Sequence, residues 1–223
     1  MTPKLFGQAM LKFFSGLILL GLLLFLPAGT LRFRNGWIFL GILFIPMFCA
    51  GIVMMAKSPE LLKKRLGADE REREQKAVIL SSGVMFLAAF VLAGLNYRFG
   101  WIRMPDWTVY AAAAVFLAAY ALYAEVLREN VWLSRTVEVQ ENQKVVDTGL
   151  YGIVRHPMYA ATLVLFLSMG FVLGSPLSFA VLLLYIPIIA KRIRNEEKVL
   201  SEGLAGYEEY RKRVKYKVIP FVW

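Results

Sequence analysis

The only histidine of the chain, His156, stands in the string GLYGIVRHPMY, where a polar segment gives way to a long apolar stretch. Pro157 suits the first turn of a helix, because the N–H that it lacks would be unpaired there in any case. Arg155 and His156 would then lie beside the free N–H groups and the positive dipole end of that helix, which favour a carboxylate or a phosphate. The string therefore predicts an anion-binding corner. A helix cap that only contacts lipid headgroups would explain the same residues equally well.

A second charged string, KRIRNEEKVL, follows the end of that apolar stretch. Arg192 and Glu196 are four residues apart, so they share one helical face and can form an Arg–carboxylate pair. The uncharged residues before them, 177–190, span roughly 21 Å of helix, which is less than the thickness of a bilayer. The charged continuation should therefore begin near headgroup depth, where ionisable groups are expensive and often functional. A juxtamembrane helix with exposed ion pairs is the alternative.

Membrane helices must position these two strings. The composition is 58% hydrophobic and the mean hydropathy is +0.56, which excludes an ordinary soluble domain. The uncharged blocks that approach the roughly 20 residues of a membrane helix are 13–31, 35–56, 77–97, 107–124 and 157–190. Gly174, Ser175 and Pro176 divide the last block into a helical hairpin. The sequence thus predicts an all-α polytopic membrane protein with about six transmembrane helices, the last two forming the hairpin.

The basic residues predict the orientation of these helices. Of the 26 Lys and Arg residues, 22 fall in the alternate loops and tails on one side, and 4 fall on the other. The positive-inside rule assigns the 22 to the cytoplasm, together with both termini. The net charge of +10 then reflects topology and contact with anionic lipids, and the basic residues form no stripe suited to nucleic acid. Cys49 lies alone in an apolar block, so neither a disulfide nor a metal cluster is expected.

Two polar segments connect the helices in different ways. Residues 57–76 are densely charged with leucines at helical spacing, which predicts an amphipathic helix on the inner leaflet or a solvated connector. Residues 137–148 alternate apolar and polar side chains, which predicts a small hairpin or an extended segment that leads into the histidine string. We accordingly divide the chain into residues 1–135, with four membrane helices and a basic cytoplasmic loop, and a C-terminal functional region, 136–223.

At this point the residues resemble a known family. The strings GLYGIVRHPMYA, RIRNEEKVLSEGLAGYEEYRKRV and IPFVW, with a helical hairpin between the first two, look like the isoprenylcysteine carboxyl methyltransferases and their bacterial relatives. These enzymes share a C-terminal region with phospholipid N-methyltransferases. The resemblance covers about residues 136–223 and is weak for the substrate. The spacing after NEE is about one residue shorter than in the eukaryotic pattern, and the segment near Gln143 is compressed.

The resemblance implies S-adenosyl-L-methionine bound in a cytoplasmic pocket of the C-terminal half, and a lipophilic acceptor that arrives from the bilayer. It also implies a bacterial inner-membrane protein without a metal, and leaves the oligomeric state open. Arg192 would hold the acceptor carboxylate, and Arg192 and Glu196 would be the catalytic residues. The cofactor-binding residues implied by similarity are Gln143, Lys144, Val145, Val146, Tyr151, Arg155, His156, Pro157, Met158, Tyr159, Glu196 and Glu197.

Several functions remain open on the sequence alone. Methylation of the carboxylate of an isoprenylcysteine-like compound leads, since an ionised carboxylate needs no base. A phospholipid amine or a small thiol is the second type of acceptor, and an amine would need a base such as Glu197 or His156. A scaffold or carrier is disfavoured because the first four helices contain almost no ionisable residues. Sterol reductases share the C-terminal architecture but have longer chains, and they rank low.

Overall fold

The computed structural model describes residues 3–66, 73–134 and 136–223. In these ranges the chain is helical, without strands, which confirms the predicted all-α class. The helices in chain order are α1 (Pro3–Ala28), α2 (Arg34–Lys57), α3 (Pro59–Leu66), α4 (Arg73–Phe99), α5 (Asp106–Glu129), the short 3-10 helix η1 (Gly149–Gly152), α6 (Pro157–Val172), α7 (Pro176–Leu182), α8 (Tyr185–Gly203) and α9 (Tyr207–Arg213).

Among the described residues, five helices are long and apolar enough to cross a membrane: α1, α2, α4, α5, and α7 with α8 counted together as Pro176–Gly203. Helix α6 is apolar but has only 16 residues, about 24 Å of helix. The count of six membrane helices therefore stays a prediction. The hairpin between α6 and α7 is present, because Gly174 adopts a positive φ of 67° and the Ser175 side chain caps α7 by accepting from the Ser178 N–H.

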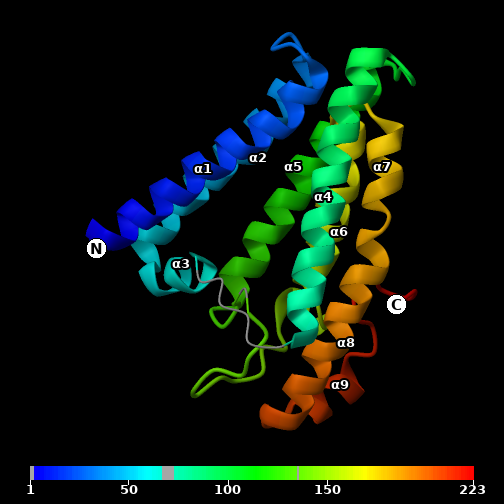
Figure 1. Ribbon diagram of the computed structural model, residues 1–223. Coiled ribbons are helices and arrows are strands. Elements are labelled where there is room, and N and C mark those ends of the chain that lie inside the picture. Colours follow the sequence, from blue (N-terminus) through cyan, green and yellow to red (C-terminus); the bar gives the residue numbers. More distant parts are fainter. Residues whose placement is uncertain (1–2, 67–72, 135) are drawn as a thin grey trace.

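The helices run up and down between two ends of the molecule (Figure 1). One end holds the connections α1–α2, α4–α5 and α6–α7, and we call it the turn end. The opposite end, which we call the pocket end, holds α3, α9, the charged part of α8 and the connection from α5 to α6. Helices α1 and α2 lie side by side and lean away from the other helices toward the pocket end (Figure 1). This alternation agrees with the alternating distribution of basic residues in the sequence.

Two glycines allow very close helix contacts near the turn end. A Cβ atom at Gly94 on α4 would lie 2.6 Å from the carbonyl oxygen of Leu24 on α1. A Cβ atom at Gly170 on α6 would lie 2.5 Å from the backbone nitrogen of Phe179 on α7. Both distances are too short for any larger residue without movement of the backbone, so these crossings depend on the missing side chains.

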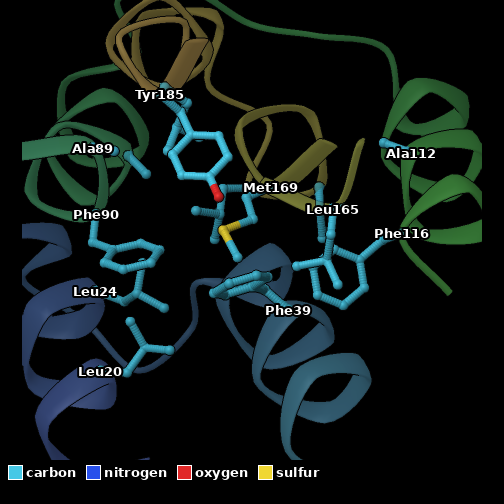
Figure 2. Packing of buried hydrophobic residues seen from close by; sticks show 14 of the residues in the cluster. Leu20, Leu24, Phe39, Ala89, Phe90, Ala112, Phe116, Leu165, Met169 and Tyr185 are labelled. Carbon is cyan, nitrogen blue, oxygen red and sulfur yellow. The ribbon is translucent and has the colours of Figure 1, made fainter. Parts of the chain in front are cut away.

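The apolar core lies where α1, α2, α4, α5, α6 and α8 meet. Figure 2 shows Phe39 of α2 at its centre, beside Phe90, Phe116 and Met169. The rings of Phe39 and Phe116 meet edge to face at 5.9 Å, a favourable geometry for aromatic pairs. Tyr185 of α8 enters the same cluster, which fixes the start of the helix that carries the second charged string.

The two polar connections differ from each other. Helix α3 lies within the expected amphipathic segment 57–76, of which residues 67–72 lie outside the described residues. Residues 137–148 form no strand and so no hairpin ladder, but an extended segment with a turn in which Asn142 adopts a φ of 59°. In this turn the Gln140 N–H donates to the Gln143 side-chain oxygen at 2.8 Å, and the Gln143 N–H donates to the Gln140 carbonyl at 3.1 Å.

Candidate cofactor and acceptor site

A pocket at the pocket end brings the two charged strings together. Its walls come from residues 130–134 and 136–146, η1, the first turn of α6, α8 and α9. The predicted site residues that line it are Gln143, Lys144, Val145, Val146, Tyr151, Arg155, His156, Met158, Tyr159, Arg192 and Glu196. Pro157 and Glu197 are not among the lining residues. The geometry thus groups nearly all of the predicted positions around one pocket.

The histidine string forms a rigid corner of this pocket. His156 is the N-cap of α6 and Pro157 is its first residue, as predicted from the string. The Arg155 and His156 backbone N–H groups donate to carbonyl oxygens of residues 216–217, at 2.9 and 2.8 Å. The Arg155 Nη1 donates to carbonyls of residues 214–215, at 2.7 and 2.9 Å. The segment 214–217 therefore fixes the corner from behind.

The protein supplies the anion of this corner itself. The buried Glu197 carboxylate accepts from the Arg155 Nε at 2.8 Å, lies 3.3 Å from the His156 Nε2 and pairs with the Lys217 Nζ at 2.9 Å. A carboxylate with several charged partners compensates the desolvation of all of them. Glu197 therefore lies behind the pocket wall, where it holds Arg155 and His156 in place.

Glu196 faces the pocket instead. Its carboxylate accepts from the Tyr159 hydroxyl, and that hydroxyl in turn accepts from the Arg192 Nε at 2.9 Å. The His156 Nδ1 lies 4.0 Å from Glu196 Oε1. The predicted pair of Arg192 and Glu196 is thus connected through the Tyr159 hydroxyl. This chain of contacts holds an arginine and a carboxylate side by side at one end of the pocket.

Sequence reasoning missed the partner that holds Arg192 on its other side. Gln75 of α4 is fully buried, accepts from the Arg192 Nη1 at 3.2 Å and donates to the Arg192 carbonyl at 3.4 Å. In the sequence Gln75 is one polar residue in a charged run, 117 positions before Arg192. No local signal distinguishes it, because the contact exists only after α4 packs against α8.

Three further tyrosines line the pocket, namely Tyr151, Tyr207 and Tyr210. Burial raises the pKa of each hydroxyl, so all three stay protonated at neutral pH. The Tyr151 hydroxyl accepts from the Asn130 side chain at 2.9 Å, and the Tyr210 hydroxyl donates to the Tyr151 carbonyl at 2.8 Å. The resemblance predicted Tyr151 as a cofactor-binding residue, whereas no sequence pattern singled out Tyr207 or Tyr210.

The pocket therefore combines charged side chains, Arg192 and Glu196 among them, with aromatic and aliphatic walls that include Trp132, Val145 and Leu204. Such a lining suits a ligand with a flat apolar part and a charged end. The charged part of α8 continues directly from an apolar helix that can cross a membrane. A second ligand that carries a lipid tail could approach Arg192 from that side.

The comparisons with known proteins find similarity to methyltransferases and to reductases. The model of the isoprenylcysteine carboxyl methyltransferase (ICMT) family matches residues 109–202, which include both charged strings. A solved structure of the eukaryotic intramembrane Ras methyltransferase ICMT matches with a TM-score of 0.55 and 21% identity. That match covers 96% of this chain and 81% of the solved chain.

Two curated relatives are reductases. A Delta(14)-sterol reductase of Mus musculus is 31% identical over 91 residues, which are 40% of this chain and 22% of the mouse protein. A Delta(14)-sterol reductase of Methylotuvimicrobium alcaliphilum is 24% identical over 135 residues, which are 54% of this chain and 32% of that protein. The matches thus span a third or less of the length of these relatives. This chain, an integral membrane protein, therefore resembles the isoprenylcysteine carboxyl methyltransferase family in sequence over residues 109–202 and shares its fold with the solved ICMT structure.

Proposed function

We propose that the protein is an S-adenosyl-L-methionine-dependent methyltransferase that esterifies the carboxylate of an isoprenylcysteine-like, lipophilic acceptor. The observation that carries this proposal is the junction of Arg192, Tyr159 and Glu196 at one end of the pocket. An arginine and a carboxylate in contact with the same pocket can hold one anionic and one cationic ligand next to each other. Methyl transfer from a cationic donor to a carboxylate requires that juxtaposition.

The residues of the pocket fit the methyl donor. Glu196 provides a carboxylate for an ammonium or a ribose hydroxyl. The aromatic and aliphatic walls provide apolar contact for an adenine ring, and the unpartnered hydroxyl of Tyr207 provides a polar group that a ligand can satisfy. When bound, the cofactor supplies an electrophilic methyl group on a sulfonium.

Arg192 is the residue that orients the acceptor. Its guanidinium is held by Gln75 and Tyr159, so its positive charge is fixed in place to pair with an acceptor carboxylate. The carboxylate oxygen attacks the methyl carbon, a C–O bond forms as the C–S bond breaks, and the products are a methyl ester and the neutral thioether. The attacking carboxylate is already ionised, so no side chain has to remove a proton.

The geometry makes an amine acceptor less suitable. An amine would need a base to remove its proton, and the two candidates are His156 and Glu197. Both are buried, and Glu197 is engaged by Arg155 and Lys217 as well as by His156. Proton transfer to Glu197 would break these ion pairs. A carboxylate acceptor avoids that cost.

Sterol reduction is the second candidate function, because the two curated relatives above are Delta(14)-sterol reductases. Reduction of a carbon–carbon double bond needs a hydride donor, such as a reduced nicotinamide dinucleotide, in place of a sulfonium. The pocket then would have to bind a phosphate-bearing cofactor. The lining carries Lys144, Arg155 and Arg192 beside Glu138 and Glu196, so charge alone does not separate the two cofactors and their binding has to be compared directly.

Cofactor binding tests the proposal first. Detergent-purified protein is titrated calorimetrically with S-adenosylhomocysteine and, separately, with NADPH. We expect heat of binding with S-adenosylhomocysteine only, and its loss in Glu196→Gln and His156→Ala. Glu208→Gln on the exposed face of α9 is the control and should bind normally. Binding of NADPH alone would contradict the methyltransferase proposal.

Acceptor preference is tested by transfer of a radiolabelled methyl group from S-adenosylmethionine. The acceptors are N-acetyl-S-farnesylcysteine, the methyl ester of the same compound, and phosphatidylethanolamine. We expect label in the free acid alone, because the ester has no carboxylate to attack. Arg192→Ala should abolish turnover on the free acid, whereas Arg194→Ala, two residues on and exposed, should retain it. Full turnover in Arg192→Ala would exclude the proposed clamp.

A further inference from the structure

One polar group of the pocket has no hydrogen-bond partner among the described residues. The Tyr207 side chain is 4% exposed, lines the pocket, and its hydroxyl makes no hydrogen bond within residues 3–66, 73–134 and 136–223. A buried hydroxyl without a partner lowers stability, because it has lost its hydrogen bonds to water and gained none in the folded chain. Such groups are uncommon in folded proteins, and they often mark a place where a ligand or an ordered water completes the hydrogen bond.

The neighbouring tyrosines show that the unpaired hydroxyl is specific to Tyr207. Tyr151 and Tyr210 line the same side of the pocket and are buried to a similar degree. The Tyr151 hydroxyl accepts from Asn130, and the Tyr210 hydroxyl donates to the Tyr151 carbonyl. Burial alone therefore does not leave a hydroxyl unpaired in this wall.

The electrostatic surroundings indicate which part of a ligand this hydroxyl would meet. Burial raises the pKa of Tyr207, the Glu197 and Glu196 carboxylates raise it further, and Arg155 lowers it. The hydroxyl is thus a proton donor, close to the charged end of the pocket. A methyl donor of the proposed kind carries an ammonium and a carboxylate at one end. The ammonium can pair with Glu196, and the carboxylate then needs a donor.

We infer that the Tyr207 hydroxyl binds the amino-acid end of the methyl donor by donating a hydrogen bond to its α-carboxylate. This inference rests on the proposed function and adds a binding residue from α9, a helix outside the two charged strings. The position of Tyr207 is set by Gly206, which precedes it with a φ of 81° and lets the chain turn sharply into α9. Ligand binding then supplies the partner that the folded chain lacks.

The test compares two tyrosine variants and two ligands. Tyr207→Phe and the matched control Tyr210→Phe each remove one hydroxyl from the same wall. Each protein is titrated with S-adenosylhomocysteine and with its decarboxylated analogue, which lacks only the α-carboxylate. Weak binding is measured by competition against labelled S-adenosylmethionine. Thermal unfolding of each ligand-free protein is recorded in the same detergent.

The inference predicts a specific pattern. Tyr207→Phe should weaken S-adenosylhomocysteine binding about tenfold, as expected for a hydrogen bond to a charged group, and leave the affinity for the decarboxylated analogue unchanged. Its ligand-free unfolding temperature should stay the same or rise, since the hydroxyl has no partner to lose. Tyr210→Phe should lower that temperature, because it leaves the Tyr151 carbonyl unpaired, and should not distinguish the two ligands.

Each other outcome has a definite meaning. If Tyr207→Phe binds S-adenosylhomocysteine as tightly as the unaltered protein, the hydroxyl is only hydrated and the inference is wrong while the proposed function stands. An equal loss for both ligands would place the contact elsewhere on the cofactor and would also overturn the inference. If the unaltered protein binds neither ligand, the proposed function itself fails.

Discussion

The turn end and the pocket end of this molecule are stabilised in different ways. At the turn end, Gly94 and Gly170 let helix backbones touch, and the buried Asn96 side chain donates to the carbonyls of Ile102 and Gly174. At the pocket end, the contacts are ion pairs and hydrogen bonds between long side chains, and a pocket remains open among them. The first end thus provides a compact support for the second. Substitutions should accordingly affect stability at one end and ligand binding at the other, with Glu197 as the exception.

Substitution of Glu197 should give the largest effect, because this residue supports both the stability of the fold and the binding of ligand. Glu197→Ala leaves Arg155 buried without its carboxylate and also removes the partner of Lys217. Loss of one partner from a buried ion pair costs about 3–5 kcal/mol. We expect that loss in the free energy of unfolding, measured by denaturant titration in detergent, and a loss of S-adenosylhomocysteine binding. A stability equal to that of Glu208→Gln would show that the buried ion pairs contribute nothing.

Substitution of Gly94 tests the backbone contact at the turn end. The added methyl group of Gly94→Ala would lie 2.6 Å from the Leu24 carbonyl and force α1 and α4 apart. Overpacking of this kind costs about 1–3 kcal/mol. Gly83→Ala on the same helix has nothing within 4 Å of its added atom and should gain up to about 1 kcal/mol from helix propensity. Thermal unfolding of both variants distinguishes the effect on the contact between α1 and α4 from the effect on helix propensity. Equal stabilities of the two variants would refute the role of the close contact.

Gln75 tests how the two halves of the chain cooperate. Gln75→Ala removes the side chain that holds the Arg192 guanidinium from α4. If Arg192 orients the acceptor, the KM for the farnesylcysteine acceptor should rise about tenfold, equivalent to ~1.4 kcal/mol. The affinity for S-adenosylhomocysteine should not change, and the exposed Gln8→Ala should be neutral in both assays. A change in cofactor affinity alone would show that Gln75 acts on cofactor binding and not, through Arg192, on the acceptor.

The smallest effect should come from an exposed ion pair at the pocket end of α5. Glu125 and Arg128 form a close contact one helical turn apart, but both are solvated and screened. Glu125→Gln should leave the unfolding temperature and cofactor binding unchanged in calorimetry at low and at physiological salt. A clear destabilisation would show that the pocket end depends on surface charge as well as on the buried cluster.

The sequence predicted the features that depend on local patterns. Apolar blocks and the Gly174 turn signal predicted the all-α class and the hairpin between α6 and α7, and residues of the strings around His156 and Glu196 line one pocket. Of the two alternatives for residues 137–148, a small hairpin or an extended segment, the extended segment is present. The roles of the individual residues in binding and catalysis stay predictions.

Other features depend on contacts that no local pattern encodes. Adjacent residues on a helix point about 100° apart, so the string NEE does not reveal that Glu196 faces the pocket while Glu197 lies behind it. Gln75 meets Arg192 across more than a hundred residues, and Tyr207 reaches the pocket through α9. Each of these contacts requires knowledge of how α4, α8 and α9 pack.

The segment 214–217 has a consequence for the biogenesis of the protein. It supplies the carbonyl partners of the Arg155 side chain and of the Arg155 and His156 backbone. Every helix in the described ranges that is able to span the bilayer precedes this segment, so the translocon can insert those helices before the ribosome has exposed residue 214. A nascent chain that stops before residue 214 would therefore be embedded in the membrane with an unfinished corner. Insertion into the bilayer and completion of the corner are thus expected to be separate steps.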